Sequence, residues 1–175
     1  KDLIALYGMN LQTSSSAVSG DFSMIHNDYN GFRNFIDSVI IKSALDQSHV
    51  NLSDLAYFTE SLQGAHQEIL LRGDFEGVIS DFSFRNMGIG TSSGTMLFGN
   101  LKMKGLPDVE NSEINLSLKN SRVRLTDVQR IQIPPYHSPN YLRLPEEILR
   151  LGTVKLDGSF NGTIHDFKAN SKFNT

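Results

Sequence analysis

One stretch of the chain has the spacing of a catalytic motif. Gly90-Thr-Ser-Ser-Gly94 matches the Gly-x-Ser-x-Gly pattern, in which the central serine, here Ser92, is the nucleophile of many esterases. That motif works only between a strand and a helix, with a histidine and an acid nearby. Here the residues on both sides, 87–89 and 95–98, look like strands. The sequence therefore predicts a hairpin turn at 90–94, and an esterase at Ser92 is the least favoured function.

The other residues that could do chemistry are scattered. The chain has no cysteine, and its histidines lack the spacing of metal ligands. These histidines are His26, His49, His66, His137 and His165. The acidic pairs Asp108 with Glu110 and Glu146 with Glu147 could act as general acid and base, but nothing in the sequence brings them together. No P-loop or dinucleotide-binding pattern is present, so we expect no catalytic residue, no metal and no cofactor.

The composition and charge argue against two further properties, nucleic-acid binding and a membrane-spanning helix. The 175 residues are 39% hydrophobic and carry a formal net charge of -3, and the basic residues are spread along the chain. A nucleic-acid partner would require clustered lysine and arginine, so none is expected. No run of 18 apolar residues is present, so no membrane-spanning helix is expected in this chain. The chain begins without methionine and ends in an alternating pattern, so we expect a piece of a longer protein.

Most of the elements that carry these residues are expected to be strands. Alternation of apolar and polar residues is typical of antiparallel strands with one buried face. It occurs in the ranges 69–79, 97–103, 114–118 and 154–164. Residues 3–11 and 35–45 are also predicted as strands, with a loop between them. The fold class predicted from this pattern is mainly β.

Helical signals are few and short. Ser53 or Asp54 is predicted to cap one helical turn, and Thr126 or Asp127 another. A third turn is predicted over 144–151, with Pro145 at its first helical position.

The chain contains an internal repeat. Residues 71–82 read LRGDFEGVISDF and residues 156–167 read LDGSFNGTIHDF, and seven of the twelve aligned positions are identical. The strand and capped turn before each copy also align, which gives approximate repeats at 35–89 and 108–174. Repeats that contact mainly their neighbours build elongated bodies with one continuous apolar stripe. We therefore expect about eight to ten strands, which at ~4.8 Å spacing extend some 40 to 50 Å.

The glycines of the Leu-x-Gly-x-Phe-x-Gly-x-Ile strand have two interpretations. Gly73 and Gly77 share the apolar face with Phe75, so large and missing side chains alternate there. Each phenylalanine can fill the space above neighbouring glycines in an ordinary core. Alternatively, the glycines allow a strongly curved sheet whose concave apolar face holds an extended ligand. The pairs at 81–82 and 166–167 are predicted to end the strand and turn it.

The order of these motifs resembles a known family. The Asn51-Leu-Ser-Asp-Leu-Ala-Tyr-Phe58 turn, the glycine-spaced strand at 71–82, and Leu101-Lys-Met-Lys-Gly-Leu-Pro-Asp-Val-Glu-Asn111 together are similar to the TamB family in its Bacteroidota form. TamB, the translocation and assembly module family, belongs to the AsmA-like superfamily. The resemblance covers roughly residues 35–175.

This resemblance implies an elongated, strongly curved, taco-like antiparallel sheet with an open hydrophobic groove and a few short helical turns. It implies a periplasmic location in a parent protein anchored in the inner membrane. The implied function is to carry phospholipid between inner and outer membranes in outer-membrane biogenesis, with a BamA-like barrel, TamA, as the parent's partner.

The groove residues expected to face phospholipid acyl chains are apolar positions of the alternating strands. They are Leu71, Phe75, Ile79, Leu97, Leu101, Met103, Ile114, Leu116, Leu118, Leu156, Phe160 and Ile164. The alternative function is a non-enzymatic structural or binding domain, similar to a β-sandwich, whose apolar residues form a closed core.

Overall fold

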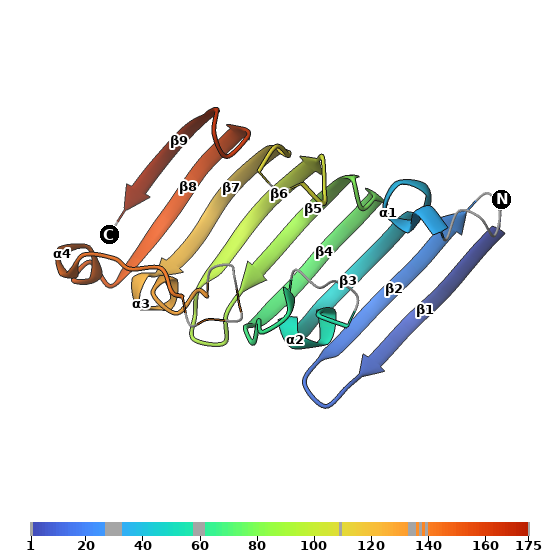
Figure 1. The fold of residues 1–175 in the computed structure, drawn as a ribbon. Helices are drawn as coiled ribbons and strands as arrows, with labels where there is room; N and C mark the ends of the chain where they lie inside the picture. Colours follow the sequence, from blue (N-terminus) through green and yellow to red (C-terminus); the bar gives the residue numbers. More distant parts are fainter. Residues whose placement is uncertain are drawn as a thin grey trace.

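The protein folds into one open sheet in which every strand pairs with its neighbours in sequence (Figure 1). This computed structural model describes residues 2–26, 33–57, 62–108, 110–132, 136, 138 and 140–174. The nine antiparallel strands are β1 (Asp2–Gln12), β2 (Ala17–His26), β3 (Ile40–Asn51), β4 (Glu68–Val78), β5 (Asp81–Gly90), β6 (Met96–Lys104), β7 (Glu113–Arg124), β8 (Thr153–Gly162) and β9 (Phe167–Asn174). The predicted mainly β fold class is confirmed.

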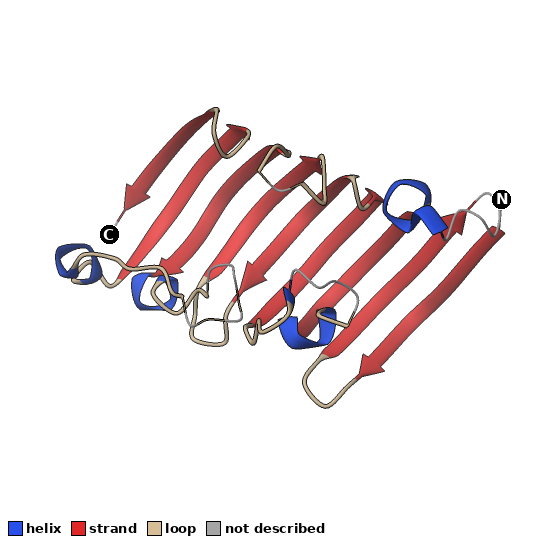
Figure 2. Cartoon of the chain, viewed as in Figure 1, coloured by secondary structure: helices blue, strands red, loops and turns tan. Residues whose placement is uncertain are grey.

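The helices lie at the ends of strands (Figure 2). They are single turns of four residues each, namely α1 (Phe35–Ser38), α2 (Leu52–Leu55), α3 (Leu125–Val128) and α4 (Glu146–Leu149). Within the described ranges, none of the helices has the length and hydropathy needed to cross a membrane. All nine strands belong to one sheet, so the described strands form a single layer.

The first 45 residues differ from the sequence prediction in two places. Residues 35–38 form α1, so the strand predicted over 35–45 begins only at Ile40. The stretch predicted as a loop contains β2. Phe22 and Met24 of this strand lie on the same face of the sheet, and glycine and serine residues are close to them in the sequence. Pairing with β1 and β3 keeps this segment extended although it contains Gly20 and Asp21, residue types that are rare in strands.

The helical turns lie where they were predicted, but with different caps. Asn51, not Ser53 or Asp54, occupies the N-cap of α2, and its side chain accepts a hydrogen bond from the Ser53 backbone N–H at 2.9 Å. The N-cap position of α3 is Arg124, without a side-chain cap. Pro145 lies one residue before its predicted place, at the N-cap position of α4. The predicted capping acids have another role, described below.

The strand register shows that the repeat is longer than the sequence comparison indicated. On β3 and β4, Ser43 pairs with Phe75, and on β7 and β8 Leu116 pairs with Phe160 at the equivalent point. The correspondence extends to the strands at the N-terminal end, where sequence similarity is weak. There Leu6 pairs with Phe22 as Phe84 pairs with Leu101. Strands β1 to β4 thus form one unit, β5 to β8 a second, and β9 matches β5 and β1.

Bulges interrupt β1, β3, β5 and β7 at one height of the sheet. On β5, Phe84 pairs with Leu101 and Met87 with Gly99, so Arg85 and Asn86 together face Asn100 alone. Asn86 has a positive φ of 51°, and its backbone N–H donates to the Asn100 side chain at 3.1 Å. The bulge in β1 is held in the same way, because the N–H of Gly8, at φ 59°, donates to Asp21 at 2.8 Å. β3 and β7 have equivalent bulges.

Glycine lies beside these bulges on every even-numbered strand. Gly20, Gly73, Gly99 and Gly158 occupy equivalent positions. A Cβ at Gly20 would collide with the carbonyl oxygen of Ala44, and one at Gly99 would collide with that of Ser117. The first glycine of the repeated motif is thus explained by close backbone approach.

The second glycine of the motif is explained by aromatic packing. Phe82 lies directly opposite Gly77, and its ring stacks on that of Phe75 with centroids 4.8 Å apart. In the second unit Phe160 and Phe167 stack at 4.9 Å across the equivalent glycine. Aspartate and phenylalanine at 81–82 and 166–167 were predicted to end a strand. Instead Asp81 and Phe167 begin β5 and β9, because the turns precede them.

A hydroxyl-to-carboxylate cluster ties each unit together at one rim of the sheet. In the first unit, the Thr13 and Ser16 hydroxyls donate to Asp54 Oδ2 at 2.6 and 2.5 Å. In the second unit, those of Thr91 and Thr95 donate to Asp127 Oδ2 at 3.0 and 2.6 Å. The acids predicted to cap helical turns therefore join those turns to the β1–β2 and β5–β6 hairpins.

Candidate functional site

The apolar face of the sheet is the most extensive candidate site. Directly paired residues on neighbouring strands point to the same face. The pairs Phe75–Phe84, Phe84–Leu101, Leu101–Leu116 and Leu116–Phe160 therefore form one continuous apolar row from β4 to β8. Parallel to it, Phe82, Met103 and Ile114 form a second row.

Most of the predicted groove residues belong to this face. Leu71, Leu97, Leu118 and Leu156 lie on it in further rows, beside the residues of the two rows above. Ile79 and Ile164 do not lie on strands, which corrects their prediction. β4 ends at Val78, which pairs with Asp81 around a two-residue turn containing Ile79. β8 ends at Gly162, and Ile164 lies in the following turn, where it is 45% exposed.

Sequence reasoning found only the end of the central strand of the face, at residues 87–89, and missed residues 81–86. Phe82 and Phe84 occupy even positions and Met87 and Ile89 odd ones, yet all four share the apolar face. The bulge between Phe84 and Met87 shifts the alternation by one residue. The sequence does alternate before and after the bulge, in two short runs. Because the bulge puts these runs out of phase, a search for one uninterrupted alternation does not find the whole strand.

The side chains of the apolar face cover one another unequally. In the central strand Phe84 is 6% and Met87 3% exposed. On the outermost strands Leu6 is 49% and Phe167 52% exposed, because each has neighbours on one side only. All nine strands belong to one sheet, so the described residues contain no second sheet that closes over this face. The arrangement offers a broad apolar surface to a ligand.

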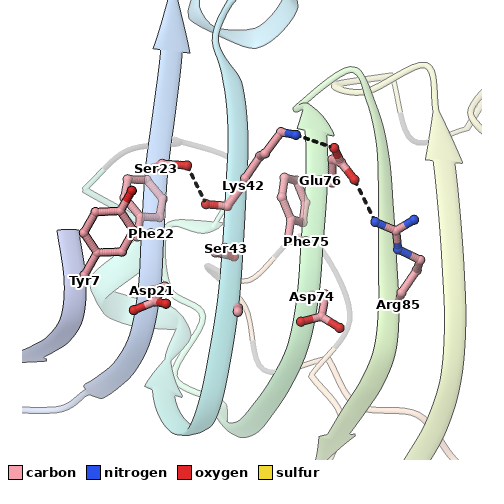
Figure 3. Close-up of a pocket in the computed structure, with 11 residues that line it drawn as sticks. Tyr7, Asp21, Phe22, Ser23, Lys42, Ser43, Asp74, Phe75, Glu76 and Arg85 are labelled. Carbon is pink, nitrogen blue, oxygen red and sulfur yellow. Dashed lines mark hydrogen bonds and ion pairs between the residues drawn. The ribbon is translucent and has the colours of Figure 1, made fainter. Parts of the chain in front are cut away.

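The opposite face carries the charged side chains of the central strands, together with Phe98, whose ring lies 5.2 Å from the Arg72 guanidinium. Glu76 on β4 accepts from Lys42 on β3 and from Arg85 on β5, both at 2.7 Å (Figure 3). The hydrogen bond and charge of Lys42, followed by the hydrogen bond of Arg85, lower the pKa of Glu76 below its ordinary value. Asp74 accepts a hydrogen bond from the Asn86 side chain at 2.6 Å on the same face. Most of the charged side chains of the central strands thus lie on the face opposite to the apolar rows.

Two loops meet over one end of the apolar face. The Gln67 side chain donates to the carbonyl oxygen of Arg130, and that of Gln132 donates to the carbonyl oxygen of Gly64, each at 3.2 Å. Between these loops and the strands lies a cavity of about 560 Å³. Its lining includes Ile69, Ile89, Leu97, Ile131 and Tyr141, together with polar groups of the loops. The cavity connects the apolar face with the rim of the sheet.

Two of the residues singled out for catalytic chemistry, Ser92 and Asp108, lie in loops between strands. Ser92 lies in the hairpin between β5 and β6, closed by a Thr91 N–H to Thr95 carbonyl bond at 2.9 Å, so the predicted hairpin turn is confirmed. Asp108 accepts from the Asn111 side chain at 2.7 Å, which lowers the pKa of Asp108. Over the described ranges, histidines and acids form no group of three or more that could hold a metal ion. His137 lies outside the described residues.

Comparison of the chain with family models, with curated proteins and with solved structures finds no match.

Proposed function

We propose that this chain is a segment of a bridge-like lipid-transfer protein, in which phospholipid acyl chains move along the apolar face of the sheet. The observation that supports the proposal is the continuous apolar face of one open, single-layered sheet. The resemblance noted above adds a periplasmic setting between inner and outer membranes. It also adds an inner-membrane anchor and a TamA-like barrel partner of the parent protein.

The free energy of a lipid tail explains why such a face is sufficient. Removing one CH₂ group from water is worth ~0.8 kcal/mol, so a tail of about 16 carbons gains on the order of 12 kcal/mol in an apolar environment. Contact with phenylalanine, leucine, isoleucine and methionine side chains replaces hydrocarbon contacts in the bilayer. A lipid therefore leaves the membrane without exposing its tail to water.

The direction of the apolar rows supports movement across the strands. The continuous apolar row runs perpendicular to the strands, from Phe75 on β4 to Phe160 on β8. Ser43 on β3 separates it from Leu6 and Phe22 on β1 and β2. Neighbouring strands lie ~4.8 Å apart, so a tail advances in small steps between similar surfaces. No lysine, arginine, aspartate or glutamate occupies the row through Phe75, Leu101 and Leu116. The barrier between successive positions is thus low.

Photo-crosslinking at two adjacent residues of β7 tests the proposal. Leu116 lies on the apolar face and Ser117 on the opposite face, because successive residues of a strand point in opposite directions. A photoreactive amino acid in place of Leu116 should capture phospholipid when the protein is expressed in a bacterial envelope, and the same residue in place of Ser117 should not. Mass spectrometry of the adducts identifies the captured molecule.

The variants at Leu116 and Ser117 also supply the control and the results that would contradict the proposal. Both variants must show the circular dichroism spectrum of the unmodified protein. Capture of lipid at both positions, or at neither, would contradict transfer along the apolar face. Capture of a protein at Leu116 would support the alternative of a non-enzymatic binding domain.

A further inference from the structure

The outer edge of β1 differs in chemistry from the edge at the other end of the sheet. Within the described residues, β1 pairs only with β2, so one of its edges is unpaired. β1 carries one charged residue, Asp2, while Leu3 is 59% and Tyr7 78% exposed. β9 carries the exposed residues Lys168 and Lys172. Lysine on an edge strand discourages pairing with other chains, so β9 is protected and β1 is not.

The repeat identifies the kind of strand that fits this edge. β1 is the counterpart of β5, since Leu6–Phe22 and Leu11–Val18 correspond to Phe84–Leu101 and Ile89–Leu97. On its other side β5 pairs with β4, and β9, a second counterpart, pairs with β8. Both β4 and β8 have the Leu-x-Gly-x-Phe-x-Gly pattern. The edge of β5 and of β9 that corresponds to the unpaired edge of β1 is therefore occupied by a strand with this pattern in both cases.

We propose that the free edge of β1 binds an antiparallel polypeptide strand with the pattern Leu-x-Gly-x-Phe-x-Gly. The occupant is a segment of this repeat type, and the binding mode is addition of a strand to a sheet. Main-chain hydrogen bonds supply affinity, and the alternating side chains supply specificity. This inference does not depend on lipid binding.

The register of β4 on β5 predicts the register of the bound strand. Phe75 pairs with Phe84, so the phenylalanine of the partner should lie opposite Leu6. Gly77 pairs with Phe82, so the second glycine should lie opposite Ile4. The partner's ring then packs over Ile4, as Phe75 stacks on Phe82.

The bulge of β1 is already shaped for the first glycine of the partner. In β4, a Cβ added at Gly73 would lie 2.7 Å from the carbonyl oxygen of Arg85, which belongs to the β5 bulge. The counterpart of Arg85 is Tyr7, next to Gly8, whose N–H is held by Asp21 at 2.8 Å. A side chain at this position of the partner would meet the Tyr7 carbonyl oxygen. The edge should therefore discriminate glycine from alanine.

A peptide copy of β4 provides the test. A fluorescent peptide with the sequence of residues 68–80 is titrated with the full chain, and binding is followed by fluorescence anisotropy and by chemical-shift changes in the ¹⁵N-labelled protein. We expect saturable binding, with the shifts concentrated in β1. The same peptide with Gly73→Ala should bind at least tenfold more weakly. Because the peptide alone is changed, this comparison does not depend on the folding of a protein variant.

Two protein variants locate the binding edge. Leu6→Lys should abolish binding, whereas Phe173→Lys on β9 should leave it unchanged, with circular dichroism confirming that both are folded. Equal binding of the glycine and alanine peptides would overturn the proposal, as would chemical shifts concentrated in β9. Dimerisation of the chain through β1 that excludes the peptide, seen by sedimentation, would also overturn it and would assign the edge to a second copy.

Discussion

Replacement of Asp127 tests the hydroxyl-to-carboxylate cluster that joins α3 to the β5–β6 hairpin. The carboxylate is 5% exposed and accepts from Thr91 and Thr95. The Thr95 hydroxyl oxygen also accepts the backbone N–H of Arg124 at 3.0 Å. Asp127→Ala removes the acceptor and leaves two threonine hydroxyls facing a small cavity.

The size of the effect follows from the number and type of hydrogen bonds lost. A hydrogen bond to a charged group contributes about 1.5–3 kcal/mol, and contributions of neighbouring bonds are less than additive. We therefore expect Asp127→Ala to lower the free energy of unfolding by about 2–4 kcal/mol. Asp127→Asn retains an amide oxygen that can accept the Thr95 hydroxyl, so its loss should be nearer about 1 kcal/mol. Against a typical domain stability of about 5–15 kcal/mol, both losses are measurable.

Urea unfolding followed by circular dichroism measures these differences. The unfolding midpoint should decrease in the order wild type, Asp127→Asn, Asp127→Ala, with an unchanged slope against urea concentration. An Asp127→Ala variant with the wild-type midpoint and slope would refute the reasoning, because the cluster would then contribute nothing to stability.

The acid dependence of stability gives an independent check on Asp127. Burial opposes ionisation of Asp127, but the hydrogen bonds that it accepts, first that from Thr95, outweigh burial and lower its pKa below the ordinary value of 3.8. The folded protein then binds this proton less readily than the unfolded chain. The stabilisation is fully present above pH 3.8 and is lost as the pH falls through the lower folded-state pKa. Asp127→Asn should remove this part of the acid dependence.

Three other substitutions test the packing of the sheet. Gly99→Ala should lower the free energy of unfolding by about 2 kcal/mol or more in urea titration, because its Cβ meets the Ser117 carbonyl oxygen; a neutral result would contradict the close approach. A double-mutant cycle of Phe75→Leu and Phe82→Leu should show a coupling of about 0.5–1.5 kcal/mol, and strict additivity would argue against the ring stacking. Glu76→Gln should cause only a small loss in thermal stability that disappears at high salt, since its ion pairs are exposed; an equal loss at low and high salt would contradict an electrostatic origin.

The sequence was sufficient for the features that depend on local alternation. The strands around Phe75, Leu101, Leu116 and Phe160 could be predicted because each has an uninterrupted period of two. The hairpin at 90–94 could be predicted because its flanks were strand-like on both sides. These features predict most of the apolar face.

Features that depend on neighbouring strands could not be predicted. β2 was missed because Gly20 and Asp21, residue types that are rare in strands, interrupt it, and its pairing with β1 and β3 keeps it extended. The bulge at Arg85 and Asn86 hides the face of β5, since its position is set by the Asn100 side chain on another strand. The role of Asp127 was missed for the same reason, because its partners lie on a hairpin 32 and 36 residues away.

The strictly sequential order of the strands has a consequence for how such a molecule changes in length. Each strand pairs only with the strands before and after it in the chain, so every pairing is local in sequence. Folding can therefore begin at a hairpin with a short turn, such as β5–β6, and spread in both directions, and the longest connection to close is that between Arg124 on β7 and Thr153 on β8. A four-strand unit can be duplicated or deleted without rearranging the others. Gene duplication can thus change the length of the molecule unit by unit and leave the structure of each unit unaltered.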